Sequence, residues 1–441
     1  MQASAIKFSQ IEDRIDAEYY KPEYLDLETK LIRLVNLGNF LTKLETGNWV
    51  NKHCFSNGSI PYIKVEQVKD VFLEDGEDKL NIECFKIFNN PLLDKGDILL
   101  SRVGTVGIAS IFLSDTKSTF SDNVIRLKVK NLNPFYLVIF LNSKFGRSQI
   151  ERLTKQAVQG VINYQSIKSI KIPALSQSFQ QRIEKMVKEA QEKRKLADEK
   201  YKEAEEILNK ELGLEDLDLS TQKTFEAKFS EAEDRFDPEY YQSKYKKIIS
   251  KLKTQNSKPL GEIVKIRKGI EVGHESYTTE GVPFIRVQDY NEKEISISGS
   301  TNFIRPYLYA ELKKNHKPDT GEIIYSKDGT VGRAFVVPED SREFIVSGGI
   351  LILTPRDIDN YYLALVLNSE IVRSQAVRKS IGAIIQHLSI DEVKKLQIPI
   401  LPQSTQQKIS SLIQKSFKFR KESKELINKA KREVEEMIEK N

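Results

Sequence analysis

Cysteine is scarce in this 441-residue chain, which contains only Cys54 and Cys84. No Cys-x-x-Cys pair occurs, and no histidine lies at the spacing from a cysteine that zinc fingers use. The sequence therefore predicts neither a disulfide framework nor a metal finger, and it predicts no metal site. The chain also lacks an apolar run of membrane length, and its N-terminus lacks the hydrophobic segment of a signal peptide. We expect a protein of the cytoplasm.

Histidine is also scarce, and a strong excess of one charge is missing. The four histidines, His53, His274, His316 and His387, are scattered without the spacing of metal ligands or of a catalytic triad. The 69 lysines and arginines are nearly balanced by 63 acidic residues, which leaves a net charge of +6. This balance permits nucleic acid as a partner, but any DNA-binding surface must then come from segregation of charge.

Proline and glycine are both absent from residues 179–212, where Glu, Lys, Ala, Arg and Leu dominate. This composition predicts one long helix. Apolar residues recur there on alternating four- and three-residue steps, with Arg194 in the one gap: Ile183, Val187, Ala190, Ala197, Tyr201, Ala204 and Leu208. Such a heptad seam is typical of a helix that lies along another helix.

The C-terminal stretch repeats this helix, 226 residues further along the chain. The same seam positions are taken there by Ile409, Ile413, Ser416, Arg420, Ser423, Ile427, Ala430 and Val434. Residues 7–24 likewise return at 228–245, with eleven of eighteen positions identical. The chain is therefore an internal duplication. The tyrosines of the repeated leading segment predict packing on the central helices, and contact with another subunit is the alternative.

Each long helix follows a module in which apolar and polar residues alternate as in β-strands. Pro-Tyr-Ile-Lys-Val at 61–65 parallels Pro-Phe-Ile-Arg-Val at 283–287. A Gly-Thr-Val-Gly turn follows at 104–107 and at 329–332, where glycine's backbone freedom lets it join two strands. Residues 132–150 and 358–376 are each predicted to form an amphipathic helix.

The two modules differ most in the loops between these shared signatures. A common scaffold with different polar loops predicts two related sites of different specificity, and side chains of these kinds bind base edges or phosphates. The candidate base-contacting residues are Asn48, Asn51, Lys52, Gln67 and Lys69 in the first module, and Glu271, His274, Gln288, Asp289 and Asn291 in the second. Lys64 and Arg286 are expected to neutralise phosphate, and Arg102, Lys327 and Arg333 complete the candidate DNA-binding set.

The chain resembles the specificity (S, HsdS) subunit of a type I restriction-modification system over nearly its whole length. The resemblance is carried by the paired Pro-x-Ile-x-Val strands, the paired Gly-Asp/Glu-Ile…Gly-Thr-Val-Gly turns and the paired Ile-Pro…Gln-x-x-Gln-Gln segments before the long helices. It implies a non-catalytic subunit with two target recognition domains, each reading half of a bipartite, asymmetric DNA site. The helices would set the spacer and, with the leading segments, recruit two methyltransferase subunits, to which restriction subunits add. S-adenosylmethionine and ATP/Mg belong to those partners, so this chain is expected to bind no cofactor.

The expected fold class is α/β (α+β), with two recognition modules separated by two long helices that form an intramolecular antiparallel coiled coil and an internal pseudo-twofold repeat. The predicted domains are a leading segment (1–36), target recognition domain 1 (37–172), a central helix (173–213), a linker with the repeated leading segment (214–258), target recognition domain 2 (259–398) and a C-terminal helix (399–441).

The sequence gives little support to a methyltransferase or a nucleotide-hydrolysing enzyme. Asn133-Pro134-Phe135-Tyr136 lacks the second proline of a methyltransferase motif, and neither Gly-Thr-Val-Gly turn supplies the lysine of a phosphate-binding loop. A coiled-coil scaffold with two protein-binding heads stays open as an alternative. A DNA reader should gather its cations on one side, whereas a scaffold should scatter them among carboxylates. The cations in question are Lys52, Lys64, Lys69, Arg102, Arg286, Arg305, Lys313, Lys314, Lys317, Lys327 and Arg333.

Overall fold

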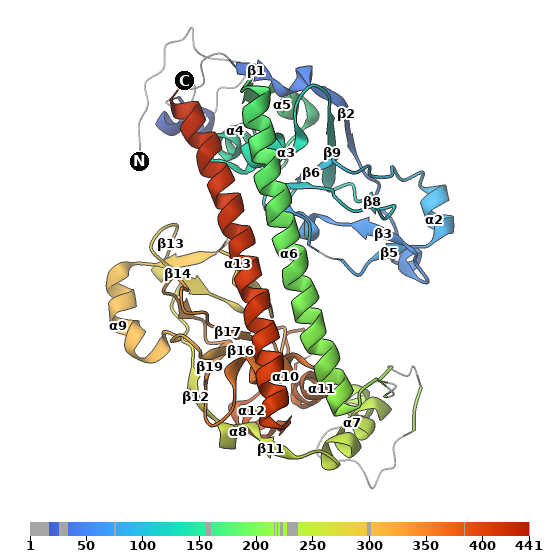
Figure 1. Ribbon diagram of the computed structural model, residues 1–441, viewed down its shortest axis with the longest axis vertical. Helices are drawn as coiled ribbons and strands as arrows, with labels where there is room; N and C mark the ends of the chain where they lie inside the picture. The colour runs from blue at the N-terminus through green and yellow to red at the C-terminus, as the bar shows by residue number, and fades with distance from the viewer. Residues whose placement is uncertain are drawn as a thin grey trace. The chain divides into compact units, whose positions relative to one another are not determined.

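The computed structural model describes residues 17–25, 34–74, 76–154, 160–215, 217, 219–220, 224–226, 237–297, 301–382 and 384–440. The chain forms two compact units, the first of residues 1–195 with 420–441 and the second of residues 196–419. The boundary falls inside both long helices, α6 (Gln177–Leu212) and α13 (Gln403–Glu439) (Figure 1). Much of both leading segments lies outside the described residues. No helix within the described ranges is long and apolar enough to cross a membrane.

The first unit is built on a five-stranded sheet of order β2-β9-β6-β7-β4, in which only the β4–β7 pair is parallel. Its strands are β2 (Leu41–Thr46), β9 (Val124–Val129), β6 (Ile98–Ser101), β7 (Ala109–Ile111) and β4 (Val71–Phe72). A smaller sheet joins β5 (Lys79–Leu80), β3 (Ile60–Ile63) and β8 (Thr119–Phe120), and β1 (Leu34–Asn36) pairs with β10 (Lys171–Pro173).

The second unit repeats the order of the first four strands of this main sheet, which extends the duplication from sequence to topology, while its second sheet has four strands in place of three. Its main sheet is β12 (Val264–Lys268), β19 (Ile350–Pro355), β16 (Ile323–Ser326) and β17 (Ala334–Val336). Its second sheet is β13 (Tyr277–Thr278), β15 (Asn302–Ile304), β14 (Val282–Ile285) and β18 (Ile345–Val346), and β11 (Ser257–Pro259) pairs with β20 (Gln397–Pro399). Both β3 and β14, the Pro-x-Ile-x-Val strands, have one antiparallel and one parallel neighbour.

Short helices accompany the sheets of both units. In the first they are α2 (Ile82–Ile87), α3 (Pro134–Asn142), α4 (Lys144–Leu153) and α5 (Tyr164–Ser169). In the second they are α7 (Ser243–Lys253), α8 (Leu260–Ile263), α9 (Pro306–His316), α10 (Asn360–Asn368), α11 (Glu370–Lys379) and α12 (Ile390–Lys395). One-turn 3₁₀ helices lie in several of the loops that connect the strands.

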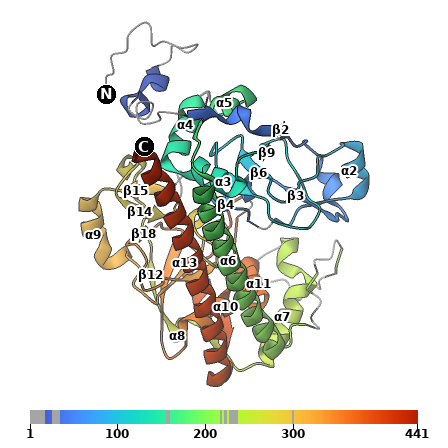
Figure 2. The ribbon, with the colours of Figure 1, turned by 45° about the horizontal axis from the view of Figure 1, so that its top comes forward.

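The amphipathic helices predicted at 132–150 and 358–376 are each two helices, which corrects the prediction. Ser143 stops α3 and caps α4, and Ser369 separates α10 from α11, because both serines have extended backbone angles. α3 is apolar on every side, since its central residues are all buried. α3 lies against α6 (Figure 2), where the Tyr136 and Phe179 rings meet edge to face at 6.5 Å.

The predicted heptad seam is confirmed as a buried stripe on both long helices, since all its apolar members and both serines are buried. In the first unit the helices run antiparallel, because Arg182 pairs with Glu433 at 2.9 Å and Lys193 with Glu422 at 2.6 Å. The Ser423 hydroxyl donates to the Ala190 carbonyl at 2.7 Å. In the second unit Ser416 donates to the Ala197 carbonyl at the same distance. Small residues at these positions let the two backbones approach closely.

The described parts of the leading segments contact the modules, and Tyr245 of the repeated segment also shares a buried apolar cluster with Tyr201 and Leu208 of α6, as the predicted packing on the central helices requires. The Arg152 guanidinium of α4 lies 4.1 Å from the centre of the Tyr19 ring and donates to the Tyr19 carbonyl. Arg378 of α11 lies 4.0 Å from the Tyr240 ring centre and donates to the Tyr240 carbonyl. The two copies therefore anchor this segment by the same cation–π contact.

An ion cluster with at least one buried member lies on the main sheet of each unit. In the first, Arg126 of β9 contacts Glu45 of β2 and lies 3.2 Å from Asp97, and its side chain is only 2% exposed. Burial lowers the pKa of Arg126 and raises the pKa of Asp97. In the second unit Glu322 takes the place of Asp97, but its cation is Arg267 of β12. The cation has thus moved to the neighbouring strand.

Candidate nucleic-acid interface

An open hollow of about 580 Å³ lies on the smaller sheet of the first unit. Its lining includes three candidate residues, Asn51, Lys52 and Lys64, together with Trp49 and Glu66. Trp49 is the chain's single tryptophan, and 61% of its surface is exposed. The hollow therefore combines an aromatic plane, cations and hydrogen-bonding groups, a combination that suits nucleobases and phosphates.

The hollow's inner wall is held by buried polar contacts. Tyr62 donates its hydroxyl to the Asn48 carbonyl at 2.7 Å, and burial together with Asp122, Asp78 and Glu66 raises the pKa of Tyr62. This tyrosine stays protonated at neutral pH and acts as a donor. The Asn48 amide donates to the Phe88 carbonyl at 2.6 Å, so its side chain fixes the end of α2.

Each Pro-x-Ile-x-Val strand ends in a one-turn 3₁₀ helix that is capped in the same way. The Gln67 side chain accepts the Lys64 backbone N–H at 2.6 Å, and the Asp289 carboxylate accepts the Arg286 backbone N–H at 2.9 Å. Gln67 is 8% exposed and Asp289 is 4% exposed. Both predicted base-contacting residues therefore use their acceptors inside the protein in this conformation.

The residue before each cap points outward. Glu66 and Gln288 hold equivalent places in the two 3₁₀ helices and are both exposed. A carboxylate accepts from the cytosine amino group, whereas a glutamine amide suits adenine, so this pair offers different base chemistry from one backbone frame. The sequence prediction included Gln288 but missed Glu66.

The two candidate phosphate contacts are already engaged with carboxylates. Lys64 pairs with Asp78 at 2.6 Å and lies 5.1 Å from the Phe55 ring centre. Arg286 places its Nε 3.2 Å from Asp289. Both side chains are about one-third exposed, at 33% and 29%, so solvent and a phosphate can still reach them.

Three further candidates brace the modules. The Asn291 side chain accepts the backbone N–H groups of Lys293 and Glu294 and so builds a turn. Arg333 donates to the Tyr290 carbonyl at 2.7 Å, and Arg102 donates to the Asp122 carbonyl at 3.3 Å.

Two of the remaining candidates of the second module lie on its surface, whereas the Lys327 side chain is only 15% exposed. Glu271 and His274 are exposed, and the His274 ring lies 5.8 Å from the Tyr277 ring, centre to centre. Lys327 pairs with its neighbour Asp328, which also contacts His387 at 3.0 Å.

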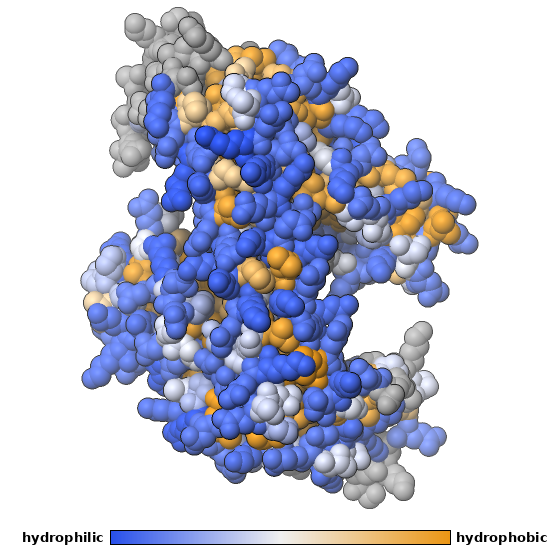
Figure 3. All heavy atoms as spheres, viewed as in Figure 1, coloured by the Kyte–Doolittle hydropathy of each residue, from blue (hydrophilic) through white to orange (hydrophobic). Residues whose placement is uncertain are grey.

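Exposed cations occur in both modules. Lys52 and Lys69 are exposed in the first, and Arg305, Lys313 and Lys314 lie at or on α9 in the second. Others pair with acids inside their module: Lys64, Arg286, Lys317, Lys327 and Arg333. Hydrophilic side chains predominate on the face drawn in Figure 3. Each module thus carries exposed cations beside cations that are paired with acids.

The Gly-Thr-Val-Gly turns are hairpins, as predicted. Gly104 and Gly329 have φ angles of 72° and 68°, which side chains other than glycine rarely adopt. Ser101 braces the first turn by donating to the Thr105 carbonyl at 2.6 Å, and Ser326 braces the second through Thr330.

The prediction against a disulfide is wrong for this module. Cys54 and Cys84 are bonded, with their Cα atoms 5.6 Å apart. The sequence does not indicate this bond, because the two cysteines are 30 residues apart. Tertiary folding brings together the 3₁₀ helix Lys52–Phe55 and α2, which carry them.

Comparison with known proteins places these features in a family. The family described as "Type I restriction modification DNA specificity domain" matches the chain twice, at residues 31–206 and 252–435. A Haemophilus influenzae protein named as a type I restriction enzyme specificity subunit is 27% identical over 182 residues, which is 40% of this chain and 43% of that protein.

Solved structures similar to this chain include a type I restriction-modification S subunit from M. genitalium, at 15% identity and a TM-score of 0.41, covering 92% of this chain and 95% of that one. The HsdS subunit from Thermoanaerobacter tengcongensis has 15% identity and a TM-score of 0.29, covering 92% and 94%. Since the family matches two segments that together make up most of the sequence, the chain belongs to the type I restriction-modification DNA specificity family.

Proposed function

We propose that this chain is the sequence-reading subunit of a type I restriction-modification complex and that it binds double-stranded DNA without catalysing a reaction itself. The observation that carries the proposal is the presence of two copies of the family domain that share the order of four main-sheet strands but differ in their polar loops. Each module then reads one half of a bipartite, asymmetric site.

Within each module, we assign base contact to exposed side chains near the Pro-x-Ile-x-Val strand. In the first these are Asn51, Lys52 and Glu66 around the hollow, and in the second they are Gln288, His274 and Glu271. Lys69 and the cations at α9 would bind phosphates, and Lys64 and Arg286 would do so by exchanging an internal carboxylate for a phosphate. Gln67 and Asp289 would hold the reading loops in shape.

The two long helices would form a continuous antiparallel coiled coil between target recognition domains 37–172 and 259–398 and so fix the spacer. Two methyltransferase subunits would dock on these helices and on the leading segments, and restriction subunits would join through them. S-adenosylmethionine and ATP/Mg would be bound by those partners, in the cytoplasm. Removing one heptad from each helix should shorten the spacer by about three base pairs, because ~10 Å of helix corresponds to about three steps of duplex.

DNA selection with the chain co-expressed beside its methyltransferase subunit tests the proposal. Bound or adenine-methylated DNA should show two short, dissimilar half-sites at a fixed separation. One contiguous motif would mean that a single module reads DNA. No enrichment, with the methyltransferase folded and S-adenosylmethionine supplied, would reject DNA reading.

That last outcome would favour a coiled-coil scaffold with two protein-binding heads. The ion pairs of Lys64, Arg286, Lys317, Lys327 and Arg333 with nearby acids are the observation on its side, since a scaffold needs no free phosphate-binding cations.

A further inference from the structure

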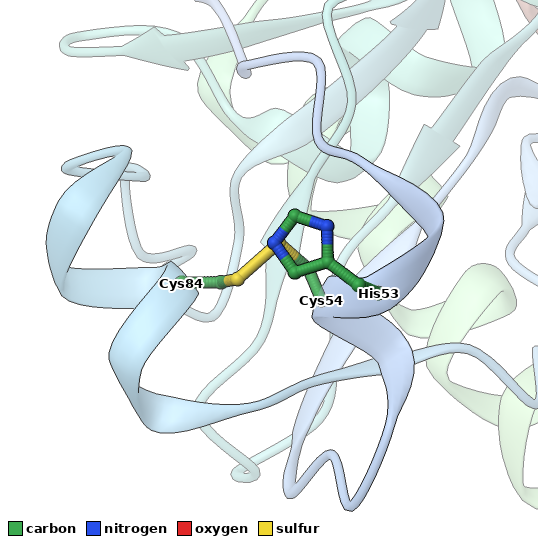
Figure 4. Close-up of side chains that lie close together, drawn as sticks. All are labelled: His53, Cys54 and Cys84. Atoms are coloured by element: carbon green, nitrogen blue, oxygen red, sulfur yellow. A yellow bond between two sulfur atoms is a disulfide. The ribbon is translucent and has the colours of Figure 1, made fainter.

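Cys54, Cys84 and His53 lie together at the edge of the hollow, and the His53 imidazole is beside the two sulfur atoms (Figure 4). We propose that, when the Cys54–Cys84 bond is reduced, these three side chains bind one thiophilic divalent metal ion such as Zn²⁺. The inference concerns this chain's own residues and does not depend on the proposed DNA function.

The spacing of His53 and Cys54 suits a tetrahedral metal, and the two bonded sulfur atoms would separate on reduction. The His53 Nε2 atom lies 3.6 Å from the Cys54 sulfur. An imidazole and a thiolate on one tetrahedral zinc lie about 3.6 Å apart, given Zn–N of about 2.05 Å and Zn–S of about 2.3 Å. All three ligand atoms fall within 4.8 Å of one another. Across the described residues, no other three His, Cys, Asp or Glu side chains come together in this way.

The backbone positions of both cysteines are held by Asn81 independently of the sulfur bond. The Asn81 N–H donates to the Cys54 carbonyl at 2.8 Å, and the Asn81 side-chain oxygen accepts the Cys84 N–H at 2.8 Å. Two thiols released by reduction would therefore stay close enough to share one metal ion.

Burial and charge also fit the site. Cys54 is fully buried and Cys84 is 4% exposed, within a small apolar cluster with Val50, Tyr62 and Leu80. Two thiolates balance the charge of a divalent ion in these apolar surroundings. His53 is exposed, so the fourth coordination position would face solvent and hold water. So small a cluster benefits from a cross-link, which either the disulfide or the metal supplies.

The chemistry balances with a dithiol as reductant. The Cys54–Cys84 bond takes up two electrons and two protons and breaks, while the dithiol becomes a disulfide. Each cysteine thiol then loses its proton as its sulfur binds the metal, and neutral His53 donates the lone pair of one ring nitrogen.

Cobalt titration of the full-length chain tests the inference, since Co²⁺ takes tetrahedral sites and reports its ligands by colour. The chain is reduced with a phosphine in the absence of oxygen, desalted and titrated. We expect one equivalent of Co²⁺ to bind with a thiolate-to-metal charge-transfer band and tetrahedral d–d bands, and Zn²⁺ to remove both. The oxidised chain should show neither the charge-transfer band nor the d–d bands. This control compares two redox states of one sequence and needs no substitution.

His53→Ala should weaken Co²⁺ binding by the reduced chain about tenfold or more, because one of three protein ligands is lost. His274→Ala is the matched control, since His274 is also exposed in a one-turn 3₁₀ helix and should leave the affinity unchanged. Absence of the thiolate band in the reduced wild type would overturn the proposal. Equal affinity in His53→Ala and wild type would also overturn it, because His53 would then not be a ligand.

Discussion

Gln288 and Asp289 are neighbours with opposite surroundings, and they provide the sharpest test of which side chains read DNA. Gln288 is exposed, whereas Asp289 is buried and accepts both the backbone N–H and the Nε of Arg286, at 2.9 Å and 3.2 Å. Gln288→Ala should therefore change DNA preference without changing stability. Asp289→Ala should lower stability without relaxing the preference at one single base pair.

The magnitudes separate the two variants clearly. A lost bidentate contact to a base costs about 1–3 kcal/mol of discrimination, roughly 5- to 150-fold at one base pair. An exposed substitution such as Gln288→Ala should change the free energy of unfolding by no more than about 0.5 kcal/mol. Asp289→Ala leaves the buried N–H of Arg286 unpaired, which costs about 1–3 kcal/mol of stability. Loss of the partly exposed ion pair with Arg286 costs at most about 1 kcal/mol more.

Urea denaturation and DNA selection should be measured on both variants beside Asp289→Asn, which keeps an acceptor for the Arg286 N–H and should retain more stability than Asp289→Ala. Selected sites should lose preference at a single position of one half-site in Gln288→Ala. If Gln288→Ala keeps the full preference, or if Asp289→Ala loses one base with unchanged stability, the assignment of the two residues is reversed.

Three further predictions follow from the first unit. Since Trp49 is the chain's single tryptophan, its fluorescence should change when DNA carrying the first half-site binds, and an unchanged emission at saturating DNA would exclude contact at the hollow. Arg126→Met should lower the free energy of unfolding by about 3–5 kcal/mol in urea denaturation, because it leaves Asp97 buried without its cation; a loss below about 1 kcal/mol would contradict the cluster's role. The Lys188 ion pair and then the Asn133 amide lower the pKa of Glu184, so its contribution to stability is present above pH 4.5 and lost as the pH falls below it. Glu184→Gln should reduce this acid sensitivity of the melting temperature, and an unchanged pH profile would argue against it.

The regular parts of the fold could be predicted because their signals are periodic or repeated within the chain. Residues 179–212 carry a heptad pattern without breakers, and the structure has one helix there. The Gly-Thr-Val-Gly turns were recognisable because both copies need glycine at a positive φ. The helix ends at Ser143 and Ser369 could not be predicted, because they depend on extended backbone angles and the apolar pattern continues across both serines.

The site was harder to predict because polarity in a loop does not tell which way a side chain points. The hydrogen-bonding groups of Gln67 and Asp289 predict contact with bases, yet both side chains cap a 3₁₀ turn from inside. The exposed residues Glu66 and Gln288 lie only one position before them in the sequence. The Cys54–Cys84 pair was missed for a related reason, since tertiary contact joins it across 30 residues.

The displaced cation in the buried clusters limits how such chains can recombine. Glu45 of β2 and Arg267 of β12 occupy corresponding strands but carry opposite charge, while Asp97 and Glu322 stay acidic. Grafting β12 into the first module would place its arginine against Arg126, and grafting β2 into the second would place its glutamate against Glu322. Either hybrid places a second like charge against a buried one. Crossovers that exchange whole modules avoid this clash. If each module reads a half-site, as proposed, new target sequences should therefore arise more readily by shuffling intact modules than by mixing single strands.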